Sequence, residues 1–391
     1  MDSIYLDHAA TTPLHPDVLT AMIPYLRDFY GNPSSLHRFG REARSAISRA
    51  RDTIAECLGC SPGELVFTSG GTESDNAAIF GVAAAHAARR RTLGARQGHI
   101  VTSQTEHHAV LHACAKLETQ GFEVTYVPVD GFGRVRVGDV IEALKPDTVL
   151  VSIMMGNNEV GTLQPIGEIG RSLREKGILF HVDAVQALGS VHIRLNDLPV
   201  DLMSFSAHKI NGPKGIGALY VSRRVSDWIP LLSGGNQERK RRPGTENVPG
   251  IVGFAEAVRI ACLNLTEKVR LLEQLRETMI RNLRSELGDS AFIVNGHPTE
   301  RLPHILNISF PGIDTETMLM NLDLEGIAAS GGSACTAGSL EVSHVLRAMG
   351  LSDQVAQSAV RFSFGMNNTP EQVEEASRKI ATIVRRIRNR Y

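Results

Sequence analysis

Lys209 has the setting in this sequence that best suits covalent chemistry. It ends the segment 204–209 (Ser-Phe-Ser-Ala-His-Lys), which includes a short apolar run and precedes a glycine-rich turn at 211–215. Burial depresses the pKa of a lysine, and the uncharged amine can form a Schiff base. Most lysines are solvated surface charges, so this interpretation depends on the motifs that end neighbouring strands.

The segment 67–74 (Phe-Thr-Ser-Gly-Gly-Thr-Glu-Ser) has the composition of a phosphate cradle. Its two glycines let backbone N–H groups converge where a helix begins, and the hydroxyl of Thr72 adds a further donor. The pattern is neither G-x-G-x-x-G nor a P-loop with its lysine, so it does not indicate a nucleotide. An ordinary Ser or Thr helix cap explains the segment equally well.

Asp183 and Gln186 end another apolar run, in the segment 180–186. Asp183 falls at the carboxyl end of a predicted strand and Gln186 one helical turn later, so both can point into the same crevice. A carboxylate there can keep a heterocyclic nitrogen protonated, and an amide can bond a phenolic oxygen. Helix capping alone explains Asp183 but not Gln186. His107 is expected at the same edge, although it can equally be an ordinary helix-start histidine.

Cys335 differs from the other four cysteines because it lies in the Gly/Ser-rich segment 330–339. A cysteine on a flexible polar loop is better placed to react than one packed among apolar residues. Cys57 and Cys60 have C-x-x-C spacing, but a single pair without nearby histidines is a weak signal for zinc or redox chemistry. We therefore interpret Cys335 as the reactive thiol and expect no metal site.

Apolar runs that alternate with helical segments must position these residues. The predicted strands are 65–68, 99–103, 123–127, 148–154, 179–183, 202–206 and 218–221, and the predicted helices between them are 72–88, 107–120, 167–176 and 184–188. This alternation favours a parallel sheet with helices on both faces, in which ligands bind beyond the carboxyl ends of the strands.

The pattern changes after about Gly250. A long amphipathic stripe over 265–287 is followed by strand-like runs at 305–310 and 360–363 and by a closing helix from Pro370. We predict a large domain over 17–260 and a smaller α+β domain formed by 1–16 and 261–391, which carries a mobile cysteine loop at about 330–340.

Composition excludes several classes of protein. The 391 residues include 41 Lys and Arg against 42 Asp and Glu, a formal net charge of −1, which argues against binding nucleic acid or anionic membranes through overall charge. No apolar run approaches the roughly 20 residues that cross a bilayer, and the first residues do not resemble a signal peptide. Five cysteines cannot form a complete disulfide framework, which favours a reducing compartment, the cytoplasm. The basic closing helix is most simply a solvated face.

Taken together and in order, the motifs resemble those of the NifS/IscS-type cysteine desulfurases, which are pyridoxal phosphate (PLP) enzymes of the class V aminotransferase family. The resemblance covers nearly the whole chain. It includes Tyr-Leu-Asp-His-Ala-Ala at 5–10, Thr-Glu-His-His at 105–108, Asn-Asn-Glu-Val-Gly at 157–161 and Ser-Gly-Gly-Ser-Ala-Cys at 330–335, together with the segments above. It implies fold type I, an α/β architecture with a mainly parallel seven-stranded sheet and a smaller α+β domain.

The resemblance also implies a role for each matching residue. Lys209 would attach PLP covalently, Asp183 would bond its pyridine nitrogen, His107 would stack on the ring and Gln186 would bond the phenolic oxygen. The phosphate would be held by Gly71, Thr72, Ser206 and His208, and by Thr245 of the partner subunit. The substrate would be bound by Asn158, Arg361 and Asn32, and Cys335 would be the nucleophile.

The implied reaction converts L-cysteine to L-alanine and leaves a persulfide on Cys335. The implied partners are a second copy of the chain and a sulfur-acceptor protein for iron–sulfur cluster assembly or tRNA thiolation, with no direct contact to nucleic acid or membrane. Ser233, Asn236 and Pro243 depart from the usual family pattern, and the longer C-terminal tail of some members has no counterpart. The identity of the acceptor and the use of selenocysteine therefore stay open.

Two alternatives remain from the sequence. One is a related PLP enzyme, such as a transaminase, lyase or epimerase, in which Cys335 is incidental. The other is a nucleotide-binding or sulfur-relay module without catalysis.

Overall fold

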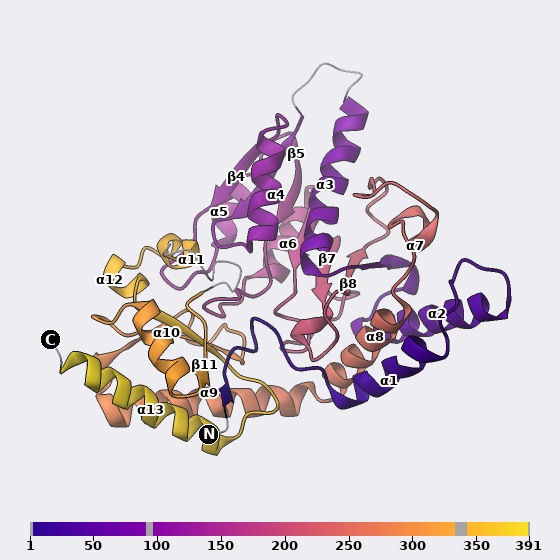
Figure 1. Cartoon of the computed structure of the whole chain (residues 1–391). Helices are drawn as coiled ribbons and strands as arrows, with labels where there is room; N and C mark the ends of the chain where they lie inside the picture. The colour runs from indigo at the N-terminus through magenta and orange to yellow at the C-terminus, as the bar shows by residue number, and fades with distance from the viewer. Residues whose placement is uncertain (1–2, 91–96, 333–341, 390–391) are drawn as a thin grey trace.

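A seven-stranded sheet forms the centre of the computed structural model, which describes residues 3–90, 97–332 and 342–389 (Figure 1). Its strand order is β2-β8-β7-β6-β5-β3-β4. The strands are β2 (Leu65–Thr68), β3 (His99–Ser103), β4 (Glu123–Val127), β5 (Thr148–Ser152), β6 (Leu179–Asp183), β7 (Leu202–Ser206) and β8 (Gly217–Val221). Only β8 runs antiparallel to its neighbours in this sheet, so the predicted mainly parallel seven-stranded sheet is confirmed.

Helices cover both faces of this sheet because its strands are apolar on both sides. Leu202 of β7 packs with residues of α3 (Gly71–Arg90) and α4 (His108–Glu118). Its neighbour Met203 faces the other side, in a cluster with residues from several further helices. These are α1 (Pro16–Arg27), α2 (Arg38–Leu58), α5 (Val137–Glu142), α6 (Ile166–Glu175) and α8 (Val248–Leu263). Burial on both faces is what parallel sheets require.

A second, antiparallel sheet with the order β12-β10-β9 has its own apolar core. Its strands are β9 (Ile293–Asn295), β10 (Ile305–Ser309) and β12 (Ala359–Ser363), and the helices around it are α9 (Leu265–Leu287), α10 (Thr315–Leu324), α11 (His344–Ala348), α12 (Asp353–Ala356) and α13 (Pro370–Arg388). Helices α9 and α13 pack side by side (Figure 1). Arg385 of the basic closing helix pairs with Glu286 at 2.8 Å, so part of its charge is engaged within the chain.

The N-terminal segment joins the two sheets. Its strand β1 (Ile4–Tyr5) pairs in parallel with β11 (Ile327–Ala328), beside the second sheet. The following residues, Ala9 to Thr12, then cross to the carboxyl edge of the seven-stranded sheet, where Thr12 Oγ1 donates to the carbonyl of His208 at 2.8 Å. The predicted division of the chain at 16/17 and 260/261 into two domains stays a prediction.

The predicted short helix at 184–188 is wrong. The chain forms hydrogen-bonded turns there instead, in which the amides of Ala187 and Leu188 both donate to the carbonyl of Ala184. Gly189 then adopts φ +67°, a left-handed conformation that ends any helical continuation. A second short element, α7 (Gln237–Lys240), contains three residues with positive φ and is a tight turn rather than a regular helix.

Within the described ranges, no single helix is long and apolar enough to span a membrane. Among the described helices, α8 and α9 taken together reach the length and composition of a span, and the two are bent by 74°.

The second core predicts a stability effect. Phe362 of β12 is fully buried there, so Phe362→Ala is expected to lower the free energy of unfolding by about 3–5 kcal/mol. Urea denaturation followed by circular dichroism measures the change. The exposed Leu324→Ala at the end of α10 is the control, expected within about 0.5 kcal/mol of the parent. Equal stability of the Phe362 variant and the parent would contradict the assignment of this core.

Candidate active site at the carboxyl edge of the sheet

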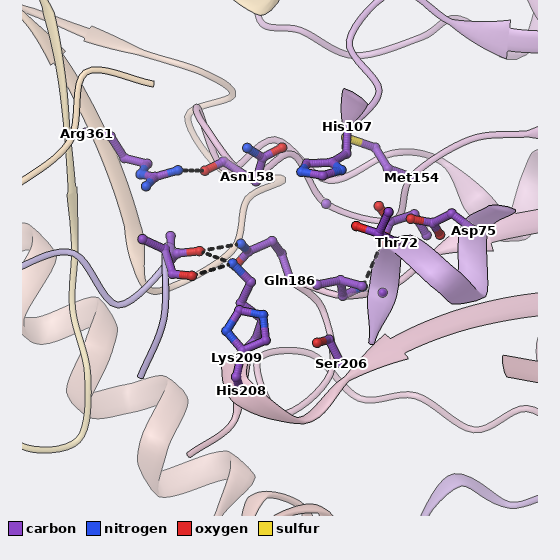
Figure 2. A pocket seen from close by; sticks show the side chains of 16 residues that line it. Thr72, Asp75, His107, Met154, Asn158, Gln186, Ser206, His208, Lys209 and Arg361 are labelled. Carbon is purple, nitrogen blue, oxygen red and sulfur yellow. Dashed lines mark hydrogen bonds between the residues drawn. The ribbon is translucent and has the colours of Figure 1, made fainter. Parts of the chain in front are cut away.

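A cavity of about 200 Å³ lies beyond the carboxyl ends of β3, β5, β6 and β7 (Figure 2). The structure brings ten of the residues predicted from the sequence to its wall: Gly71, Thr72, His107, Asn158, Asp183, Gln186, Ser206, His208, Lys209 and Arg361. Nine of them come from segments that follow strands of the large sheet or begin its helices. Arg361 comes from β12 of the second sheet, so both sheets contribute to one site.

The amine of Lys209 is held by two backbone carbonyls of the N-terminal segment. Lys209 ends the 3₁₀ turn Ala207–Lys209 that follows β7, and its Nζ donates to the oxygen of Ala9 at 2.6 Å and of Ala10 at 2.8 Å. These two carbonyls orient the amine. The amine therefore stays directed into the cavity (Figure 2).

His208 is fixed beside the same segment. Its Nδ1 lies 3.2 Å from the hydroxyl of Thr11. Burial and, to a smaller extent, the nearby charges of Lys209 and Lys214 lower the pKa of His208 to about 4. The imidazole is therefore neutral near pH 7 and acts there as a hydrogen-bonding group.

Gly71 lets the start of α3 pack closely against the segment that follows β6. A Cβ atom on Gly71 would lie 2.6 Å from Cγ2 of Val185, so a side chain at this position would displace its neighbour. Thr72, Ser206 and His208 line both the main cavity and an adjoining one of about 360 Å³. Backbone amides at a helix start, two hydroxyls and an imidazole form a set of donors that suits a phosphate group.

Asp183 provides a buried carboxyl group at the end of β6. Its Oδ1 accepts a hydrogen bond from the amide of Val185 at 2.9 Å. Burial raises the pKa of Asp183, while electrostatic interactions with His107 and Lys209 and the bond from Val185 oppose the rise. A carboxyl group in this position is stabilised as an anion by a protonated ring nitrogen placed beside it.

His107 and Gln186 complete the walls around the Asp183 carboxyl. His107 is the N-cap of α4, and its Nδ1 accepts from the amide of Ala109 at 3.1 Å. Gln186 Nε2 donates to the carbonyl of Ala9 at 2.9 Å, and its Oε1 lies 3.3 Å from Nε2 of His304. His304 therefore adds an orienting contact that sequence reasoning missed.

Arg361 supplies a buried cation on the side of the cavity opposite Thr72 and Asp75 (Figure 2). Its side chain is 1% exposed; Nη1 donates to the carbonyl of Asn158 at 2.8 Å, and Nη2 lies 3.0 Å from Oδ1 of Asp7. Its Nε is buried and has no hydrogen-bond partner among the described residues. A planar guanidinium with unused donor capacity suits a carboxylate ligand.

Two buried acids near the cavity were also missed by sequence reasoning. Asp75 lines the cavity one turn into α3, and burial raises its pKa well above the usual value, with repulsion from Asp183 adding to the rise. Glu106 accepts from the hydroxyl of Ser103 at 2.5 Å and from the amide of Met154 at 2.9 Å. Both acids lie where the sequence predicts the start of a helix. Acidic residues are common and usually exposed at helix starts, so nothing in the sequence indicates that these two are buried.

Two of the described site residues, Asn32 and Thr245, do not line this cavity. Asn32 is exposed in the segment before α2, where its Oδ1 accepts from the amide of Ser34. Thr245 lines a separate cavity of about 60 Å³ on the other side of Ser69. Cys335 lies outside the described residues.

The four described cysteines are free, and burial raises the pKa of the Cys60 thiol to about 12. Within 3–90, 97–332 and 342–389, no group of three or more His, Cys, Asp or Glu side chains could hold a metal ion.

The fold and the cavity together define an α/β enzyme whose site suits a phosphorylated ligand and a carboxylate. The aminotransferase class-V family model matches residues 4–375. The chain is 51% identical over 388 residues to "Putative cysteine desulfurase IscS 1" of Bacillus subtilis (strain 168), which covers 99% of this chain and 100% of that protein. The chain belongs to the aminotransferase class-V family.

Solved structures agree with this placement. A structure titled "NIFS-LIKE PROTEIN" matches with a TM-score of 0.89 and 40% identity, covering 98% of this chain and 99% of that chain. Another structure, titled "SspA in complex with cysteine", matches with a TM-score of 0.80 and 38% identity. The match covers 93% of this chain and 99% of that chain. The resemblance to NifS/IscS-type proteins that the motifs predict is confirmed.

The buried Glu106 should make the free energy of unfolding depend on pH. Burial raises its pKa from 4.5 to about 8, with repulsion from Asp183 contributing and the bonds from Ser103 and Met154 opposing. Between these values the folded protein keeps a proton that the unfolded chain has released, so the contribution of Glu106 to the free energy of unfolding falls as the pH rises. The fall is about 1.4 kcal/mol per pH unit.

Glu106→Gln removes this titration. The stability of the variant relative to the parent should therefore rise by several kcal/mol between about pH 5 and pH 8, as measured by urea denaturation at each pH. The exposed Glu168→Gln is the control and should show no such trend. A Glu106 variant whose stability relative to the parent does not change with pH would contradict a buried, protonated Glu106.

Proposed function

We propose that the chain is a PLP-dependent cysteine desulfurase that converts L-cysteine and the thiol of Cys335 into L-alanine and a persulfide on Cys335. Atoms balance in this reaction, because one sulfur atom moves from the substrate to the protein thiol. The observation that carries the proposal is the convergence of the Lys209 amine, the Asp183 carboxyl and the Gly71 backbone on one cavity. Similarity to proteins named cysteine desulfurase supports the same activity.

The residues of the cavity fit PLP. Gly71 brings the backbone at the start of α3 to the cavity wall, and Thr72, Ser206 and His208 supply donors for a phosphate beside it. Asp183 is a buried carboxyl group that a protonated pyridine nitrogen would stabilise. His107 would stack on the ring, Gln186 would bond the phenolic oxygen, and Lys209 would attach the cofactor. Bound PLP supplies an electron sink that makes the Cα proton of an amino acid acidic.

Arg361 and Asn158 are proposed to hold the carboxylate of L-cysteine. The guanidinium is already fixed by the carbonyl of Asn158 and by Asp7, so binding costs little further ordering. Lys209 then accepts the Cα proton, since its flexible side chain lies at the same cavity and its amine is directed there.

Cys335 is proposed to receive the sulfur. Its thiolate attacks the substrate sulfur, an S–S bond forms as the Cβ–S bond breaks, and the electron pair of the broken bond stays with the substrate. A proton taken up at Cβ completes the methyl group of alanine. Thiolate character and access control such attack, and the polar composition of 330–339 favours both.

A second copy of the chain is proposed to complete the site. The segment around Asn32 exposes large apolar side chains, among them Tyr30 at 74% and Leu36 at 82%, which is typical of a surface that another chain covers. Asn32 and Thr245 both lie away from the cavity of their own chain. We therefore propose a homodimer in which each chain lends Asn32 and Thr245 to the site of its partner.

The persulfide is proposed to pass to an acceptor protein of iron–sulfur cluster assembly or tRNA thiolation in the cytoplasm. The balanced net charge gives no support for direct binding of nucleic acid or of a membrane. We retain the division into a large domain over 17–260 and a smaller one formed by 1–16 and 261–391, because the second sheet has a separate apolar core.

Mass spectrometry after exposure to L-cysteine tests the reaction. The peptide that contains Cys335 should gain one sulfur atom while an equal amount of alanine forms. Cys335→Ala should lose the modification and at least about 100-fold of turnover, since it removes the nucleophile. Full turnover by the Cys335→Ala variant would instead identify a related PLP enzyme in which Cys335 is incidental.

Arg361→Lys tests the substrate site. A lysine keeps the charge but loses the planar pair of donors, so kcat/KM for L-cysteine should fall about 10- to 100-fold. Steady-state alanine production measures the loss. The absorption spectrum of the bound cofactor should stay unchanged as a control, and an unaltered kcat/KM would exclude Arg361 from carboxylate binding.

A further inference from the structure

The carboxylate of Glu159 lies where the segment that contains Cys335 leaves and re-enters the described chain. Its Oε2 accepts a hydrogen bond from the hydroxyl of Ser343 at 2.5 Å. The same oxygen is 3.2 Å from the position that a Cβ atom on Gly332 would occupy, so the backbone of Gly332 passes directly beside it. One buried acid, 2% exposed, therefore adjoins residues on both sides of the segment.

Glu159 is itself held in place by the cavity wall. Its amide donates to Oδ1 of Asn157 at 2.9 Å, and its carbonyl accepts from Nδ2 of Asn307 at 3.2 Å. Asn157 in turn donates to the carbonyl of Thr105 at 3.0 Å, which joins the segments that carry Asn158 and His107. The Glu159 carboxylate is thus presented by a rigid frame, the property required of a positioning group.

The neighbouring contacts attach the same ends to other residues of the cavity. His344, which follows Ser343, donates through Nε2 to the carbonyl of Glu106 at 2.9 Å. On the other side, Ser330 and Arg361 exchange backbone hydrogen bonds, with the amide of Ser330 donating to the carbonyl of Arg361 at 3.1 Å. Ser330, before the Cys335 segment, is therefore attached to Arg361, which lines the cavity. His344, after the segment, is attached to Glu106, which directly precedes the lining residue His107.

We propose that Glu159 is a positioning residue for sulfur transfer, which bonds Ser343 after the Cys335 segment and packs beside Gly332 before it, on the wall that presents Asn158. The inference rests on the proposed function, because it assigns the Cys335 thiol as the sulfur acceptor. A charge-assisted bond from Ser343 to a buried carboxylate is among the stronger hydrogen bonds of a protein. Its loss lets the ends of the segment shift, and a displacement of about 1 Å is costly for a group that must reach a reacting atom.

A single-turnover experiment on the holoenzyme separates positioning from general damage. One equivalent of L-cysteine is added, and two rates are followed: the change in cofactor absorption on substrate binding and the appearance of the persulfide on Cys335 by alkylation and mass spectrometry. Glu159→Ala and Ser343→Ala should each slow persulfide formation about tenfold or more. The absorption change should stay within about twofold of the parent rate.

Conservative and combined variants sharpen the test. Glu159→Gln and Ser343→Thr keep an acceptor oxygen and a hydroxyl, so each should recover part of the persulfide rate. The Glu159→Ala/Ser343→Ala double variant should be no slower than the slower single variant, because both remove the same bond. Ser377→Ala is the matched control, since its buried hydroxyl bonds only within α13.

The outcomes separate this inference from the proposed function. The inference alone is overturned if the parent enzyme forms the persulfide and the Glu159→Ala and Ser343→Ala variants form it within about twofold of the parent rate. An equal loss in both measured rates also overturns it, because Glu159 would then be a general structural residue. A parent that forms no persulfide refutes the proposed function and this inference together.

Discussion

The bond between the Lys209 amine and the carbonyls of Ala9 and Ala10 is the contact on which the rest of the site depends. It ties the end of β7 to an N-terminal segment that is otherwise attached to the second sheet through β1 and β11. Gln186 bonds the same Ala9 carbonyl, and Thr12 bonds the carbonyl of His208. Without this segment, the carboxyl edge of the large sheet would lack one wall of its cavity.

Several ionisable side chains around the cavity are buried, including acids and a histidine. Asp183 and Asp75 line the cavity, Glu106 directly precedes the lining residue His107, and burial raises the pKa of each of the three acids. His181, between β5 and β7, is held neutral, because burial lowers its pKa to about 3 and Ser152 and Ser204 occupy its ring nitrogens. Buried acids of this kind are stabilised by protons or by a cationic ligand. A bound ring that carries a protonated nitrogen would meet that need at Asp183.

Sequence reasoning predicted the large sheet closely because its strands are short apolar runs that end in turn residues. The bounds of β2, β3, β4, β6 and β7 agree with the predicted runs. The expected convergence of Lys209, Asp183 and His107 follows from the same rule, since parallel strands place their carboxyl ends at one edge. The roles of these residues toward a cofactor stay predictions.

The contacts that could not be predicted from the sequence are those made by backbone groups or between side chains far apart in the chain. The carbonyls of Ala9 and Ala10 belong to residues without functional groups, and the tie from Glu159 to Ser343 joins positions far apart in the chain. The short helix expected at 184–188 failed because Gly189 ends the turn before a helix can form. Asn32 and Thr245 lie away from the cavity of one chain, and their placement in a partner's site rests on the proposed dimer.

The central claim is that Lys209 carries PLP at this cavity. The most direct test is to reduce the purified, PLP-loaded protein with borohydride and map its peptides by mass spectrometry. A phosphopyridoxyl group is expected on Lys209 and on no other lysine. An unmodified Lys209, or the same group on a different lysine, would contradict it.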